Sequence, residues 1–76
     1  MKVVIYTTKD CPFCKRTKEF FKEHNIKYSE KDVGNDEKAA GEMIKLSGHH
    51  GVPVINIEGE IIVGFDEEKL KGALKL

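Results

Sequence analysis

Two cysteines separated by two residues are the groups in this chain best suited to covalent chemistry. They stand in the segment Cys11-Pro12-Phe13-Cys14, and the chain contains no other cysteine. Two thiols at this spacing can form a disulfide by exchange and release it again, because a thiolate attacks a disulfide sulfur. The spacing therefore predicts a thiol–disulfide exchange site.

The position of Cys11 favours a nucleophilic thiolate. Pro12 suits the first position of a helix, because its missing N–H would have no helical partner there. Cys11 would then be the N-cap residue, whose sulfur accepts hydrogen bonds from the N–H groups of Phe13 and Cys14. The positive end of the helix dipole and the nearby basic side chains add to this effect. We predict that Cys11 is the nucleophile and that Cys14, one turn further along, is a more covered resolving thiol.

Two other interpretations of the cysteine pair are weaker. A structural zinc site takes four ligands, usually two such cysteine pairs or one pair with histidines three to five residues apart. The available histidines are His24, His49 and His50, and the last two are adjacent. The cysteines could also be inert and buried, since free cysteine often is. A structural disulfide across so short a loop would stabilise little. We therefore expect no metal at this site.

Length and charge point to one small domain without an electrostatic preference for polyanions. The 76 residues carry 13 basic and 13 acidic side chains, and we expect a single domain over residues 1–76. Such a balance creates no overall field for nucleic acid or a membrane surface. No apolar stretch approaches the roughly 20 residues that span a bilayer, and no signal-peptide pattern is present. We expect a cytoplasmic monomer whose cysteine pair cycles in a reducing compartment.

The elements expected along the chain alternate between strand and helix. Apolar periodicity and turn residues predict strands at 2–6, within 26–33, at 52–57 and at 60–63, and helices at 12–24, at 37–47 and from 66 onward. Helical spacing predicts three inward faces, made of Phe13, Thr17, Phe20, Phe21 and His24 in the first helix, of Ala39, Met43 and Leu46 in the second, and of Leu70, Ala73 and Leu74 in the third.

This order predicts an α/β fold with a four-stranded mixed sheet flanked by helices. The first two strands are joined by a helix, so they should be parallel with a right-handed crossover. The last two strands are joined by Glu58-Gly59, which is typical of a tight antiparallel hairpin. The cysteine pair follows the first strand, and ligands in such sheets bind beyond the carboxyl ends of strands.

The chain resembles the glutaredoxins of the thioredoxin-like superfamily over essentially its whole length. The residues that carry the resemblance are Tyr6-Thr7, Cys11-Pro12-Phe13-Cys14, Gly51-Val52-Pro53 and Val63-Gly64-Phe65-Asp66. It implies a thioredoxin-like fold in which Pro53 follows a cis peptide bond and packs against the cysteines. Base rates alone would favour a trans bond, because only about 5–6% of such bonds in folded proteins are cis.

The resemblance also implies a glutathione site. In that family the backbone at the position of Val52 pairs with the cysteine part of glutathione, and the segment from Gly64 to Asp66 holds its γ-glutamyl end. Tyr6 and Phe13 match positions that line the groove. The implied glutathione-binding residues are Lys9, Phe13, Val52, Pro53, Gly64, Phe65 and Asp66, with Lys9 and one residue of His49-His50 as candidates for the glycyl carboxylate. Asp66 is also the expected cap of the last helix.

Three functions remain open at this point. The first is a dithiol glutaredoxin that reduces protein disulfides and glutathione mixed disulfides, with glutathione as its reductant and no tightly bound cofactor. The second is a thioredoxin-like electron carrier, recycled by a flavoprotein reductase and serving an enzyme such as ribonucleotide reductase. The third is an iron–sulfur scaffold shared by two chains. By resemblance, Pro12 argues against the third, and Asp66 favours the first because a carboxylate suits an α-ammonium group.

Overall fold

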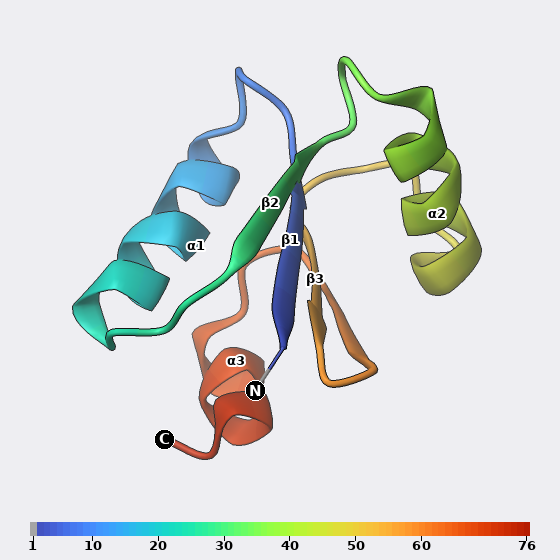
Figure 1. Cartoon of the computed structure of the whole chain (residues 1–76). Coiled ribbons are helices and arrows are strands. Elements are labelled where there is room, and N and C mark those ends of the chain that lie inside the picture. Colours follow the sequence, from blue (N-terminus) through green and yellow to red (C-terminus); the bar gives the residue numbers. More distant parts are fainter. Residues whose placement is uncertain (1) are drawn as a thin grey trace.

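The computed structural model describes residues 2–76 and contains seven helices and strands in that range (Figure 1). In chain order they are β1 (Val3–Thr7), α1 (Pro12–Glu23), β2 (Ser29–Asp32), α2 (Glu37–Ser47), β3 (Val54–Ile57), β4 (Glu60–Val63) and α3 (Glu67–Leu74). The expected order and the α/β class are confirmed. β3 begins two residues later than expected, after Pro53, which has no N–H to donate to a ladder.

The four strands form one mixed sheet in the order β2-β1-β3-β4. β1 is parallel to β2 and antiparallel to β3, and β3 is antiparallel to β4. Glu58 and Gly59 turn the last hairpin with φ values of 51° and 92°. The topology brings the carboxyl ends of β1, β2 and β4 to the same end of the sheet as the start of β3. Cys11, Pro53 and Gly64 follow or precede strands at that end.

Helices cover the two faces of the sheet unequally. α1 and α3 lie on one face and α2 lies alone on the other (Figure 1). Side chains of β1 alternate between the faces, as the pleat of a strand requires. Val3 and Ile5 join the cluster under α1 and α3, whereas Val4 and Tyr6 join the cluster under α2. Among the described residues, no helix is long and apolar enough to cross a membrane.

The structure corrects two of the expected inward positions. Leu46 is 43% exposed, because it lies on the last turn of α2, and within residues 2–76 no second helix lies beside α2 on that face. Ile44 packs against the core instead. Phe13 is 54% exposed, because the first turn of α1 stands at the rim of the cysteine site. The expected positions on α3 are confirmed: Leu70 and Leu74 are buried and Ala73 packs against them.

Candidate active site

Cys11 is the N-cap residue of α1, as expected. Pro12 begins the helix, and the backbone of Cys11 is extended, with φ −120° and ψ 104°. Of the two expected donors, the structure pairs the sulfur with the N–H of Cys14, which lies 3.1 Å from it. Cys11 is 8% exposed and Cys14 is 1% exposed, so the first thiol is the more accessible one. Both cysteines are free thiols in this structure.

Two further loops meet the cysteines at the same end of the sheet. The Val52-Pro53 peptide bond is cis, as the resemblance implied, and the carbonyl oxygen of Val52 lies 3.8 Å from Sγ of Cys11. The N–H of Gly64 donates to the carbonyl oxygen of Pro53 at 2.8 Å. Gly64 has a φ of 82°, a conformation that favours glycine. These contacts link the cysteine loop, the proline loop and the end of β4.

Asp66 stands two residues beyond Gly64 and begins the last helix. Its Oδ1 atom accepts a hydrogen bond from the backbone N–H of Lys69, with 3.1 Å between nitrogen and oxygen. The predicted role of Asp66 as a cap is therefore confirmed. The residue before the cap, Phe65, packs into the core, where its ring makes an edge contact with Phe20 at 6.2 Å between centroids. The cap therefore places a carboxylate at the sheet end that carries the cysteines.

The other expected binding residues are spread around the rim. The ring of Phe13 is largely exposed, and the guanidinium of Arg16 lies 5.7 Å from its centroid. Lys9 is exposed beside Cys11. His49 and His50 are exposed in the loop before Val52.

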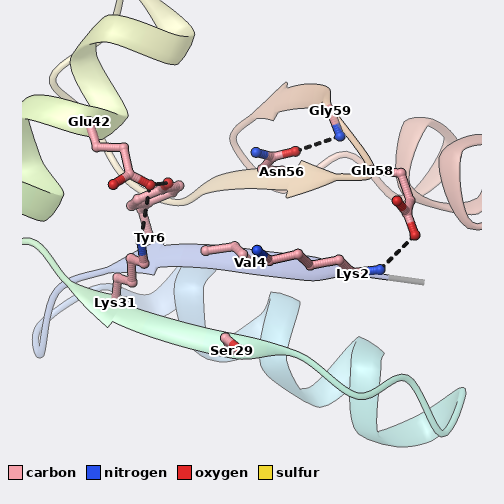
Figure 2. Close-up of a pocket in the computed structure, with 9 residues that line it drawn as sticks. All are labelled: Lys2, Val4, Tyr6, Ser29, Lys31, Glu42, Asn56, Glu58 and Gly59. Carbon is pink, nitrogen blue, oxygen red and sulfur yellow. Dashed lines mark hydrogen bonds and ion pairs between the residues drawn. The ribbon is translucent and has the colours of Figure 1, made fainter.

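Tyr6 does not lie on the cysteine side of the sheet, so the implied groove position is wrong. Successive side chains of β1 point to opposite faces, and Tyr6 points toward α2. Its hydroxyl donates to Glu42, whose carboxylate also pairs with Lys31 (Figure 2). Burial and this hydrogen bond raise the pKa of Tyr6 to about 12. Tyr6 therefore lines a separate pocket of about 320 Å³ on this face, with Val4 and Asn56.

A polar cavity of about 230 Å³ lies beside the cysteines on the α1 side of the sheet. It is lined by Thr7, Thr8, Lys9, Cys11, Cys14, Lys15, Lys18, Glu30 and Asp32. Three lysines and two carboxylates thus surround the cysteine pair. Among residues 2–76, no three histidine, cysteine or carboxylate side chains are grouped closely enough to hold a metal ion.

Three of the residues that line this cavity are connected by hydrogen bonds. Nζ of Lys18 lies 3.0 Å from Oε2 of Glu30, and the buried hydroxyl of Thr7 donates to the same oxygen at 2.7 Å. These two donors lower the pKa of the Glu30 carboxyl, and Glu30 in turn raises the pKa of Lys18. We name these three residues the thiol-side triad.

The thiol-side triad was not among the site residues predicted from the sequence. Lys18 lies four residues after Cys14, so helical spacing could have placed the two on one face. Glu30 could not be found in this way. It reaches the site because β2 pairs with β1 in a register that sets Ile5 opposite Glu30.

Cys14 is strongly disfavoured as a thiolate in the resting state. Burial is the largest cause that raises its pKa to about 12, and its hydrogen bond with Cys11 adds to this. A hydrogen bond to the backbone of Thr8 and the positive charge of Lys18 act in the opposite direction. The two thiols of the motif therefore sit in different environments three residues apart.

The fold and the site together define a class of protein. A mixed sheet between helices, with a cysteine pair at a helix start and a cis-proline against it, is the arrangement of the thioredoxin-like proteins. The family model for glutaredoxin matches residues 3–62, so the chain belongs to the glutaredoxin family. Membership implies thiol–disulfide oxidoreductase activity.

Known relatives agree with this assignment. A glutaredoxin-like 8.6 kDa protein in the rubredoxin operon of Clostridium pasteurianum, described as uncharacterized, is 48% identical over 90% of this chain and 91% of its own length. Glutaredoxin 3 of Escherichia coli is 35% identical over 86% of this chain and 78% of its own length. Among solved structures, the thioredoxin-like protein BC3987 is 37% identical and superposes with a TM-score of 0.88 over 93% of this chain and 97% of its own.

Proposed function

We propose that this protein is a dithiol glutaredoxin that uses glutathione to reduce protein disulfides and glutathione mixed disulfides. The observation that carries the proposal is the hydrogen bond from the N–H of Cys14 to the sulfur of Cys11 at the start of α1. A sulfur in this position is stabilised when it becomes negative, by the N–H and by the positive end of the helix. Cys11 is also the more accessible of the two thiols.

The reaction follows from these two environments. The Cys11 thiolate attacks a substrate disulfide, forms a mixed disulfide and releases one thiol. A protein substrate is then released when Cys14 attacks the Cys11 sulfur, which leaves a Cys11–Cys14 disulfide. Two molecules of glutathione reduce that disulfide in succession: the first forms a mixed disulfide with Cys11, and the second attacks it, which regenerates both thiols and releases glutathione disulfide. When the mixed disulfide is with glutathione itself, a second glutathione can resolve it without Cys14.

The geometry around the cysteines supports glutathione as the reductant. The cis-proline loop places the Val52 carbonyl near Cys11, and Gly64 is hydrogen-bonded to that loop. Asp66 then presents a carboxylate at the same end of the sheet, where an α-ammonium group would be attracted. A relative of the same family is described as glutaredoxin 3.

Cysteine variants test the assignment of roles. Cys11→Ser should abolish reduction of a glutathionylated peptide in the presence of glutathione and glutathione reductase, because it removes the nucleophile. Cys14→Ser should retain this activity and lose the reduction of a protein disulfide that needs the dithiol route. Steady-state rates of both variants decide the matter, and an active Cys11→Ser beside an inactive Cys14→Ser would reverse the roles.

A thioredoxin-like carrier recycled by a flavoprotein reductase is the second candidate. It is favoured by the solved relative that is described as thioredoxin-like. Asp66→Asn separates the two, because asparagine caps a helix as well as aspartate but carries no charge. If Asp66 binds the ammonium of glutathione, turnover with glutathione should fall about tenfold, because the variant loses a hydrogen bond between charged groups. Turnover with dithiothreitol, which has no ammonium group, should not change. Unchanged turnover with glutathione, together with turnover by thioredoxin reductase, would favour the carrier.

A further inference from the structure

The proposed dithiol route requires Cys14 to ionise in a place that opposes it. Cys14 is 1% exposed, and its resting pKa is raised to about 12, chiefly by burial. The sulfur must nevertheless become a thiolate when it attacks the mixed disulfide. A group that stabilises negative charge at Cys14 would therefore speed this step without affecting the first attack by Cys11.

The chemical balance of the step shows which kind of group is needed. The Cys14 thiolate forms a bond to the Cys11 sulfur, and the bond between Cys11 and the substrate sulfur breaks. The substrate leaves as a thiolate with the electron pair of that bond. It takes up one proton from water, which matches the proton that Cys14 lost. No oxidant or other reactant enters this step. What assists it is a positive charge near Cys14, because the attacking sulfur carries a negative charge.

The charged groups that face the cavity come from three segments. They are Lys9 in the loop before the cysteines, Lys15 and Lys18 on α1, and Glu30 and Asp32 on β2. Lys9 and Lys15 are exposed, whereas the side chain of Lys18 is 28% exposed. Lys18 stands one helical turn from Cys14 and lines the same cavity. It is the lysine of the three that is best placed to act on the buried thiol.

Lys18 is also held in position by partners on the sheet. Glu30 pairs with it at 3.0 Å, and Glu30 is itself fixed by the hydroxyl of Thr7, which is 1% exposed. A lysine side chain alone is flexible and gains little from a surface ion pair. Here a buried hydroxyl orients the carboxylate, and the carboxylate orients the ammonium.

We propose that Lys18, held by the positioning residues Glu30 and Thr7, stabilises the Cys14 thiolate when it resolves the mixed disulfide. The proposal rests on the proposed function, because only the dithiol route requires Cys14 to ionise. In this role Lys18 acts through Cys14 and not on the substrate directly. Its effect is therefore confined to the second step of the reaction.

Reaction with dithiobis(nitrobenzoate) separates the two steps in one experiment. Cys11 attacks the reagent and releases one coloured thiolate, and Cys14 then displaces the second from the mixed disulfide. Stopped-flow absorbance gives the rate of each release across a range of pH. Lys18→Met should slow the second release about tenfold and shift its pH profile upward by about one unit, the effect expected when an opposite charge beside a thiol is lost. The first release should change less than twofold.

Matched variants remove the simpler explanations. Lys31→Met breaks the ion pair with Glu42, which has the same length, 3.0 Å, as the pair between Lys18 and Glu30. Glu42 also accepts a hydrogen bond from a hydroxyl, but it lies on the other face of the sheet. The Lys31→Met variant should leave both releases unchanged. Lys18→Arg keeps the charge and should restore most of the second rate. Lys18→Gln serves in place of the methionine variant if thermal melting shows that the latter does not fold.

The outcomes distinguish this proposal from the one on which it depends. An unchanged second release in Lys18→Met and Lys18→Gln would overturn the role of Lys18 and leave the proposed function intact. Equal slowing in Lys18→Met and Lys31→Met would also overturn it, because the loss would then be a general effect of stability. If Cys11→Ser still released the first thiolate at the wild-type rate, the proposed function itself would fail.

Discussion

The two faces of the sheet carry the same three functional groups in different surroundings. On each face a hydroxyl from β1 donates to a glutamate oxygen, and a lysine pairs with that oxygen at 3.0 Å. The thiol-side triad is Thr7, Glu30 and Lys18, and what we name the open-side triad is Tyr6, Glu42 and Lys31 (Figure 2). In both cases the donors lower the pKa of the glutamate carboxyl.

The difference lies in what stands beside each triad. The cavity of the thiol-side triad includes the buried thiol of Cys14, whereas the residues that line the open-side pocket include no thiol. The lysine of the thiol-side triad is also less exposed, at 28% against 39% for Lys31. The Lys31–Glu42 pair is therefore only a surface ion pair. The Lys18–Glu30 pair has the same composition, but it lies beside the sulfur of Cys14 and acts on it electrostatically. The neighbours of each pair decide its role.

The hydrophobic clusters of the two faces differ as well. The cluster under α1 and α3 contains nine buried residues, and the cluster under α2 contains four. Two helices exclude water from the first face, and one helix covers part of the second. Most of the burial that stabilises the fold therefore lies on the face that also holds the cysteines.

The largest expected effect tests this unequal burial. Phe21 is fully buried in the larger cluster, and Phe21→Ala should lower the free energy of unfolding by about 3–5 kcal/mol. Met43→Ala in the smaller cluster should cost about 2–3 kcal/mol, because half-buried neighbours can move into the space. Urea unfolding followed by circular dichroism measures both. A larger loss for Met43→Ala would show that the face under α2 dominates stability.

The ionisation of Tyr6 tests the open-side triad at high pH. Its pKa is raised from 10.0 to about 12, so the neutral phenol stabilises the folded state fully below pH 10. This contribution is lost as the pH rises through the folded value. In a Tyr28→Phe background Tyr6 is the remaining tyrosine. Ultraviolet absorbance should then show tyrosinate forming near pH 12, or together with alkaline unfolding. Titration of a folded protein near pH 10 would contradict the buried bond to Glu42.

Removal of each β1 hydroxyl is expected to have a smaller effect on stability. Tyr6→Phe and Thr7→Val each delete one donor to a partly exposed carboxylate, which should cost about 1 kcal/mol in urea unfolding. The two variants should differ in kinetics. Thr7→Val frees Glu30 and should slow the second release from dithiobis(nitrobenzoate) about twofold. Tyr6→Phe should leave that rate unchanged, and an equal effect of both would remove the distinction between the triads.

The smallest expected effect is the acid dependence of stability. The pKa values of Glu30 and Glu42 are lowered from 4.5 in the folded state, so each carboxylate stabilises the fold above pH 4.5. That stability is lost as the pH falls through the lowered folded values. Both side chains are at least 40% exposed, so each contribution should be below about 1 kcal/mol. Glu30→Gln and Glu42→Gln should each make the melting temperature depend less on pH in the acid range. Such an effect in only one variant would show that the two triads are not equivalent.

Local features of the fold were predictable from residue type and order. Cys11 as a cap, Pro12 at the first helical position and Asp66 as the last cap depend on hydrogen bonds within a few residues, so residue type and order are sufficient. The same holds for the Glu58-Gly59 turn, whose two residues have positive φ values. Strand and helix order followed from apolar periodicity. The cis bond at Pro53 came from the family resemblance and not from local physics.

The side chains that meet across the sheet depend on the tertiary arrangement of the strands. The register of β1 and β2 brings Glu30 to Thr7 and Lys18, and the pleat directs Tyr6 to the opposite face. A shift of β2 by one residue in that register would turn Glu30 away from Thr7 and Lys18, because successive side chains of a strand point to opposite faces. The exposure of Leu46 depends in the same way on the absence of a second helix beside α2 among the described residues. Contacts between distant segments depend on register and coverage, which the local sequence pattern does not specify.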